Sequence, residues 1–165
     1  MDIFLKAKKS SLKDFLQSYN NSLVQKKTSI QHGGYGLLHS AVSGKNTPLV
    51  KFLIEEGIDV NQRDKNQQTA LHYAVQVYGD KITKTDIDIV KLLLESDCDI
   101  NITDIFGNSS LWTACHFSKG IGYQIVEVLM KYSPDIRHKN KVNKSPLDLS
   151  RERGYKKLEN ILVNK

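Results

Sequence analysis

Several side chains in this sequence are of types that could support catalysis or hold a metal, including five histidines and two cysteines. Cys115 and His116 are neighbours, but consecutive residues on a helix point about 100° apart, so they would not form a nucleophile and base pair. His32, His116 and His138 have no Cys, Asp or Glu at metal-ligand spacing. The run at 33–36 lacks the Lys and Ser/Thr that complete a phosphate-binding loop. We therefore expect no catalytic site, no cofactor and no metal.

The remaining two histidines lie at equivalent places in two similar blocks. The clearer block runs from Asp64 to Asn101 and contains three ordered parts: Thr-Ala-Leu-His-Tyr-Ala at 69–74, an apolar segment at 89–94 and Asp-Cys-Asp-Ile-Asn at 97–101. Thr69 can cap a helix, while Leu71 and Ala74 form a narrow apolar face. The block predicts a turn followed by two antiparallel helices.

The same order of parts recurs along the chain. It is seen upstream at 34–41 and 49–61, downstream at 104–114 and 125–136, and without its closing part at 140–162. Residues 1–27 are helical in character but poorly patterned. A unit this short cannot bury its own apolar face and therefore requires stacked neighbours. We divide the single domain, 1–165, into an N-terminal cap at 1–31, repeats at 32–63, 64–103 and 104–136, and a C-terminal cap at 137–165.

These blocks resemble the ankyrin repeat pattern D-x-x-G-x-T-P-L-H-x-A, V-V-x-L-L-L and G-A-D-V-N. The resemblance covers essentially the whole chain. It implies an all-α solenoid of about five helix-turn-helix units, with three full repeats and degenerate caps at both ends. It also implies that His39 and His72 hydrogen-bond between neighbouring turns instead of acting as bases or metal ligands. Cys98 and Cys115 are interpreted as reduced core thiols.

Composition and charge agree with one small domain. The 165 residues are 39% hydrophobic, and neither a secretory signal nor a stretch of transmembrane length is recognisable, so we expect a cytoplasmic protein with no membrane association. The net charge of +6 is concentrated at the two ends, while 64–103 is acidic. A nucleic-acid binder would carry a continuous basic stripe with stacking aromatics, so nucleic acid is not an expected partner. The acidic unit favours a partner that is basic there.

Two insertions distinguish the second and third full repeats from the first. Residues 77–86 and 118–123 both fall between paired helices, and we expect them to lie side by side, remote from the turn tips. Three interpretations remain open, namely a binding role, harmless variation in loop length and an extended first helix.

The resemblance also implies a function, because ankyrin stacks bind other proteins through their turn tips and the inner face of their first helices. At these positions the sequence has Tyr35, Lys65, Asn66, Gln68, Gln76, Val77, Ile105, Phe106, Asn108, His116, Phe117, Lys141 and Lys144, with His32, Ser43, Val142, Glu152 and Arg153 as further surface contributors. Among them we expect the apolar pair Ile105 and Phe106 to anchor the partner. The alternative is that Phe106 packs on the next turn.

We expect a non-catalytic protein that is monomeric when free and binds another protein, with no small-molecule substrate. Two roles fit these residues. The chain is similar to small bacterial ankyrin proteins that act as inhibitors or immunity proteins for a partner toxin or enzyme. The alternative is a viral or bacterial effector that acts on host signalling proteins, similar to inhibitors of NF-kappaB. The sequence does not separate the two roles.

Overall fold

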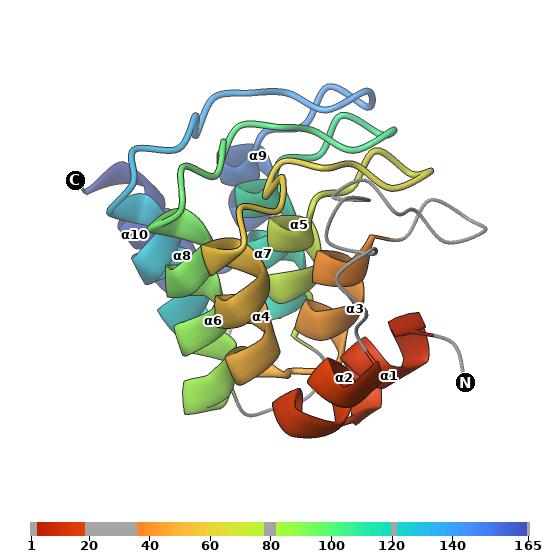
Figure 1. Ribbon diagram of the computed structural model, residues 1–165. Coiled ribbons are helices and arrows are strands. Elements are labelled where there is room, and N and C mark those ends of the chain that lie inside the picture. Colours follow the sequence, from red (N-terminus) through yellow and green to blue (C-terminus); the bar gives the residue numbers. More distant parts are fainter. Residues whose placement is uncertain (1–2, 19–35, 78–81, 120–121, 165) are drawn as a thin grey trace.

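A computed structural model describes residues 3–18, 36–77, 82–119 and 122–164. Within these ranges the chain forms ten helices in five successive pairs and no strand, which confirms the predicted all-α solenoid (Figure 1). The pairs are α1 (Ile3–Lys9) with α2 (Leu12–Ser18), α3 (Leu37–Ser43) with α4 (Thr47–Glu55), α5 (Ala70–Ala74) with α6 (Lys84–Leu94), α7 (Ser110–Ser118) with α8 (Tyr123–Met130), and α9 (Pro146–Glu152) with α10 (Lys156–Val163).

The helices are arranged in two rows. The first helices α3, α5, α7 and α9 pack in sequence, and the second helices α4, α6, α8 and α10 form the neighbouring row. Long turns between the repeats leave the stack on one side and end in tips that lie side by side, at the top of Figure 1. The repeats therefore present a row of first helices and a row of tips that belong to one stack.

The core is a continuous stripe along the stack. Leucines at equivalent places in the first helices, Leu38, Leu71 and Leu111, are completely or almost completely buried. Leu53, Leu93, Leu129 and Leu162 are buried in the same way in the second helices. Burial of such side chains against the next repeat is the main contribution that holds a solenoid together.

Short polar side chains mark where several helices begin. Ser109 Oγ accepts a hydrogen bond from the Trp112 backbone N–H at 3.2 Å and so caps α7. At the start of α5, the predicted cap Thr69 forms a capping box with His72. Gly36 stands at the corresponding place before α3 and has no side chain with which to cap the helix.

The N-terminal helix pair is fastened to the first full repeat by two residues between α3 and α4. Asn46 Nδ2 donates to the carbonyl oxygen of Ser10 at 2.7 Å, and its Oδ1 accepts from the N–H of Leu49, the third residue of α4, at 3.3 Å. A Cβ atom on Gly44 would lie 2.1 Å from the carbonyl oxygen of Lys8, so only glycine allows α1 to approach this closely.

The insertions are built differently from each other. Helix α5 ends at Ala74, and the last three residues of the segment 77–86 form the first turn of α6. Helix α7 is longer and includes Ser118. The two segments approach each other, because a Cβ atom on Gly122 would lie 3.1 Å from Ile82 Cδ1. Residues 78–81 and 120–121 lie outside the described part of the chain.

Candidate functional site

The last three turn tips share one construction, in which a buried side chain accepts two backbone N–H groups of its own turn. Asp64 accepts from the N–H groups of Asn66 and Gln68, Asp104 from those of Phe106 and Asn108, and Asn140 from those of Val142 and Lys144. The six donor–acceptor distances are 2.8 to 3.1 Å. The third residue of each tip adopts the left-handed conformation, with φ of 60° at Gln67, 77° at Gly107 and 60° at Asn143. The three tips therefore have the same backbone shape.

Adjacent tips are joined by backbone hydrogen bonds. The N–H of Ile105 donates to the carbonyl oxygen of Asn66 at 2.9 Å, and the N–H of Lys141 donates to that of Phe106 at 2.9 Å. This ladder fixes the register, so Lys65, Ile105 and Lys141 follow one another along one row and Asn66, Phe106 and Val142 along the next. We call residues 65–67, 105–107 and 141–143 the tip ridge.

Buried histidines connect the first helices to the tips. His72 Nε2 donates to the carbonyl oxygen of Asn108 at 3.1 Å while Nδ1 accepts from the N–H of Thr69 at 3.2 Å, and His39 Nε2 donates to the carbonyl oxygen of Gln68 at 3.0 Å. Burial lowers the pKa of both histidines, although the bonds to the carbonyl groups act in the opposite direction. The predicted bonding role of the two histidines is confirmed.

The outward side chains of the tip ridge include apolar and cationic groups, together with the polar Gln67 and Asn143. Phe106 is 62% exposed, Val142 is 70% exposed and Ile105 is 36% exposed. Lys65 and Lys141 are also exposed. The alternative in which Phe106 packs on the next turn does not fit this exposure, so the structure leaves an aromatic side chain in solvent at the middle of the ridge.

A second group of side chains lies on α7 and at the residue that follows α9. The ring of His116 stacks on Trp112 with centroids 5.3 Å apart, and Phe117 contacts it edge-on at 5.4 Å. Arg153 Nη2 donates to His116 Nδ1 at 3.2 Å. Burial, followed by the nearby charges of Arg153 and Lys119, lowers the pKa of His116. The sequence analysis missed Trp112, whose spacing of four residues from His116 on a helix was the available signal.

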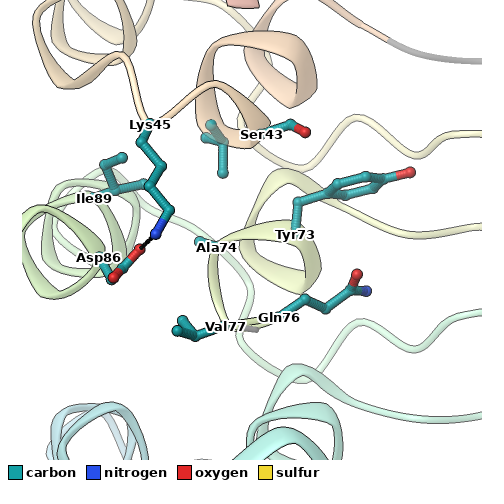
Figure 2. A pocket seen from close by; sticks show the side chains of 9 residues that line it. Ser43, Lys45, Tyr73, Ala74, Gln76, Val77, Asp86 and Ile89 are labelled. Carbon is teal, nitrogen blue, oxygen red and sulfur yellow. Dashed lines mark ion pairs between the residues drawn. The ribbon is translucent and has the colours of Figure 1, made fainter. Parts of the chain in front are cut away.

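The predicted residues Gln76 and Val77 lie beside a pocket between the first two full repeats (Figure 2). Its volume is about 370 Å³, and its lining residues come from α3, α5 and α6 together with Lys45, Gln76 and Val77. Val77 is only 8% exposed, so its side chain forms part of the wall and is not a surface contact as predicted. The reason is that α5 ends at Ala74, and helical register does not extend to Val77.

An ion pair closes one side of this pocket. Lys45 Nζ lies 2.7 Å from Asp86 Oδ1, and Thr83 donates to Asp86 Oδ2 from its backbone N–H at 2.8 Å and from its hydroxyl at 2.6 Å. Burial alone would raise the pKa of Asp86, but the bonds from Lys45 and Thr83 outweigh it and lower the pKa. The sequence analysis identified neither Lys45 nor Asp86 as a partner in an interaction.

The remaining predicted site residues have mixed positions. Asn108 is occupied within the tips, because its Nδ2 donates to Asp104 Oδ2 at 3.2 Å and its Oδ1 accepts from Asn140 Nδ2 at 2.8 Å. Lys144 forms an ion pair with Glu152. Tyr35 lies outside the described residues. The structure thus brings Lys65, Asn66, Ile105, Phe106 and Lys141 together on the ridge and places His116 and Phe117 on α7.

The expected acidic surface of the repeat at 64–103 is not on the tip ridge. Asp64 and Asp86 are almost completely buried. Glu95, Asp97 and Asp99 are exposed, but they follow α6 in the turn that closes the repeat, far along the chain from its tip. The expectation of a basic partner therefore has no support at the ridge, because the exposed charges there belong to lysines.

Burial also determines the protonation of the two cysteines. Burial raises the pKa of the Cys98 and Cys115 thiols to about 12, so both are protonated at neutral pH. In the described ranges, no cluster of three or more His, Cys, Asp or Glu side chains is suited to a metal ion. No helix in those ranges combines the length and apolar character needed to cross a bilayer.

Stacked helix pairs with hydrogen-bonded tips define an ankyrin solenoid, and comparison with known proteins agrees. A family model described as "Ankyrin repeats (3 copies)" matches residues 4–104. The chain belongs to the ankyrin repeat family, a non-catalytic fold that generally mediates interactions between proteins.

Three relatives illustrate the range of similar proteins. The chain is 39% identical over 72 residues to "Putative ankyrin repeat protein FPV233" of fowlpox virus. The matched region covers 44% of this chain and 13% of that protein. It is 31% identical over 99 residues to the nuclear factor NF-kappa-B p105 subunit of Gallus gallus, and the match covers 59% of this chain and 9% of that protein. It is 30% identical over 97 residues to "Putative ankyrin repeat protein BB_B28" of Borreliella burgdorferi, with coverage of 59% and 22%. The chain therefore spans less than a quarter of the length of each relative.

Proposed function

We propose that this chain is a non-catalytic module that binds another protein mainly through the tip ridge. The observation that carries the proposal is the exposure of Phe106 and Val142 on neighbouring tips of a fixed backbone. Aromatic and aliphatic anchors at the centre of an interface supply most of the affinity, and polar surroundings mainly set the register. The free chain is proposed to be a cytoplasmic monomer with no small-molecule substrate.

Rigidity supports Phe106 as the anchor. Its N–H is held by Asp104 at 2.8 Å, and its carbonyl oxygen accepts from Lys141 at 2.9 Å. Because the backbone is already fixed on both sides, binding would order little more than the side chain of Phe106 itself. A preorganised anchor of this kind loses little conformational entropy on association.

The first helices would supply the flank of the contact surface. Trp112, His116 and Phe117 form a contiguous aromatic group on α7, and Arg153 adds a positive charge beside it. Tyrosine, tryptophan and arginine are enriched at the centres of protein interfaces. We propose that a partner seated on the ridge also reaches this group.

Two biological roles are consistent with such a surface. As an inhibitor or immunity protein, the chain would cover the working surface of a partner toxin or enzyme. As an effector, it would bind host signalling proteins in the manner of NF-kappaB inhibitors. The similarity to a fowlpox virus protein and to the p105 subunit favours the second role, and the similarity to a bacterial protein leaves the first in place.

Site-specific photo-crosslinking in the native host tests the proposed surface. Benzoylphenylalanine would replace Phe106, which keeps an aromatic side chain on the ridge, and in a matched control it would replace Tyr132, an exposed residue in the turn after α8. We expect a discrete crosslinked partner from position 106, and we expect that position 132 does not crosslink to the same partner. The same partner from both positions, or from 132 alone, would show that the ridge is not the contact surface.

A further inference from the structure

We infer that the tip ridge recognises an acidic peptide segment in which carboxylates flank an apolar side chain. The inference rests on the proposed function and adds the chemistry of the partner. It is carried by the charges around Phe106 and by the absence of competing carboxylates among the described residues of the ridge.

Lysines stand on both sides of Ile105, in the row next to the aromatic anchor. Lys65 lies in the tip before Phe106 and Lys141 in the tip after it, and the ladder bonds at Asn66 and Phe106 hold the three tips in register. Arg63 and Lys139 are exposed at the two borders of the ridge. A segment that places an apolar side chain against Ile105 and Phe106 therefore lies beside a cationic group of each neighbouring tip.

These lysines are available to a partner. None of the ion pairs in the described part of the chain involves Lys65 or Lys141. The carboxylates that directly precede the first two of these tips are engaged in the turns, because Asp64 accepts from Asn66, Gln68 and the Tyr73 hydroxyl. Asp104 accepts from the N–H groups of Phe106 and Asn108. The ridge thus presents uncompensated positive charge.

The charge pattern gives selectivity more than affinity. Pairing an exposed lysine with a carboxylate costs little desolvation energy and adds little binding energy. A positive charge placed opposite the lysine, in contrast, weakens binding. Apolar burial at Ile105, Phe106 and Val142 would provide the binding energy, and Lys65 and Lys141 would exclude basic segments. A nucleic acid fits less well, because the ridge has a single aromatic side chain and no series of stacking rings.

Selection from a random peptide library tests the inference without assuming a sequence. The parent chain would be the target, with counter-selection against Phe106→Ala/Val142→Ser, a variant whose fold is checked by circular dichroism. We expect the enriched peptides to be acidic with an apolar residue between carboxylates. In fluorescence anisotropy, the best peptide should bind roughly ten-fold more weakly to Lys65→Glu/Lys141→Glu, as two reversed contacts predict. Lys91→Glu/Lys131→Glu, which alters exposed lysines of α6 and the end of α8, should leave its affinity unchanged.

The outcomes separate this inference from the proposed function. Enriched peptides that are basic or neutral, yet lose binding in Phe106→Ala, would overturn the acidic partner and leave the ridge as a protein-binding surface. If no peptide is enriched, or if both ridge variants bind the peptide as the parent does, the acidic partner and the proposed function of the ridge are both contradicted. Tighter binding of anionic lipid vesicles or a single-stranded oligonucleotide through Lys65 and Lys141 would also overturn the peptide assignment.

Discussion

Lys45 and Asp86 form a 2.7 Å ion pair that joins the turn between α3 and α4 to the first turn of α6. The pair ties the first full repeat to the second at the same place where Asp86 also accepts from Thr83. Because Asp86 is 4% exposed and Lys45 is half-exposed, the carboxylate is the member whose environment depends on the pair. A single side chain thus takes part in both a helix cap and a contact between repeats.

Removal of this carboxylate should destabilise the stack. Asp86→Ala leaves the Thr83 N–H and the Lys45 ammonium without their acceptor, and we expect a loss of about 1 to 3 kcal/mol in the free energy of unfolding. Asp88→Ala removes the same charge from the same helix without a cap or an ion pair, and it should cost about 0.5 kcal/mol or less. Urea unfolding followed by circular dichroism measures both, and similar losses would show that the pair contributes nothing specific.

Stability should fall on acidification in two separate ranges. The pKa of His39, His72 and His116 is lowered in the folded chain, so protons bind more readily to the unfolded chain and stability decreases as the pH falls below about 6.5. The pKa of Asp86 is also lowered, so its contribution is complete above about pH 4 and is lost as the pH falls through the folded value.

Two variants test which residues cause the loss of stability in each pH range. The free energy of unfolding of each variant is measured as a function of pH. His39→Gln/His72→Gln should flatten the decrease that begins near 6.5, and Asp86→Asn should flatten only the decrease that begins near 4. A histidine variant that keeps the full slope in its range would contradict the assignment.

Core leucines at the interfaces between repeats should be essential. Leu71→Ala or Leu93→Ala empties a completely buried position and should cost roughly 2 to 5 kcal/mol, enough to threaten a marginally stable stack. Leu16→Ala, at an exposed leucine of α2, is the matched control and should have little effect. Equal thermal melting curves for all three variants and the parent would show that the assigned packing is wrong.

Gly44 should decide whether α1 stays docked. Gly44→Val places side-chain atoms where the Lys8 carbonyl group now lies, so α1 must move away while the later repeats keep their own contacts. We expect faster hydrogen exchange in residues 3–18 and near-parent exchange in 82–119. Gly154→Asn is the control, since no atom lies near a Cβ there and asparagine tolerates its φ of 67°. Unchanged exchange at 3–18 in Gly44→Val would rule out the close approach.

The sequence was sufficient for the fold because its blocks carry the physical signals of each helix pair. The His39 and His72 bonds, the Thr69 cap and the buried leucines all follow from the motif. The short length of α5 did not, since no local signal at Val75 or Gln76 announces its end. The start of α6 could have been predicted, because Thr83 and Asp86 have capping-box spacing just before an apolar run.

The candidate site was less predictable because it depends on which way each tip residue faces. Phe106 and Asn108 are two positions apart, yet one is in solvent and the other is bonded to Asp104 and Asn140. The two side chains face differently because contacts within the turn and contacts with the neighbouring turn together determine their direction. The Lys45 and Asp86 pair likewise joins residues of different repeats, and a pattern read within one repeat cannot reveal it.

In each tip, the residue that fixes the backbone shape is different from the residues that face outward. Asp64, Asp104 and Asn140 hold the turns from within, and the outward side chains at 65, 66, 105, 106, 141 and 142 make no contribution to those bonds. Evolution can therefore exchange the outward residues one at a time without rebuilding the turn. The same separation makes these six positions a natural set for randomisation when the scaffold is to be redirected to a new target.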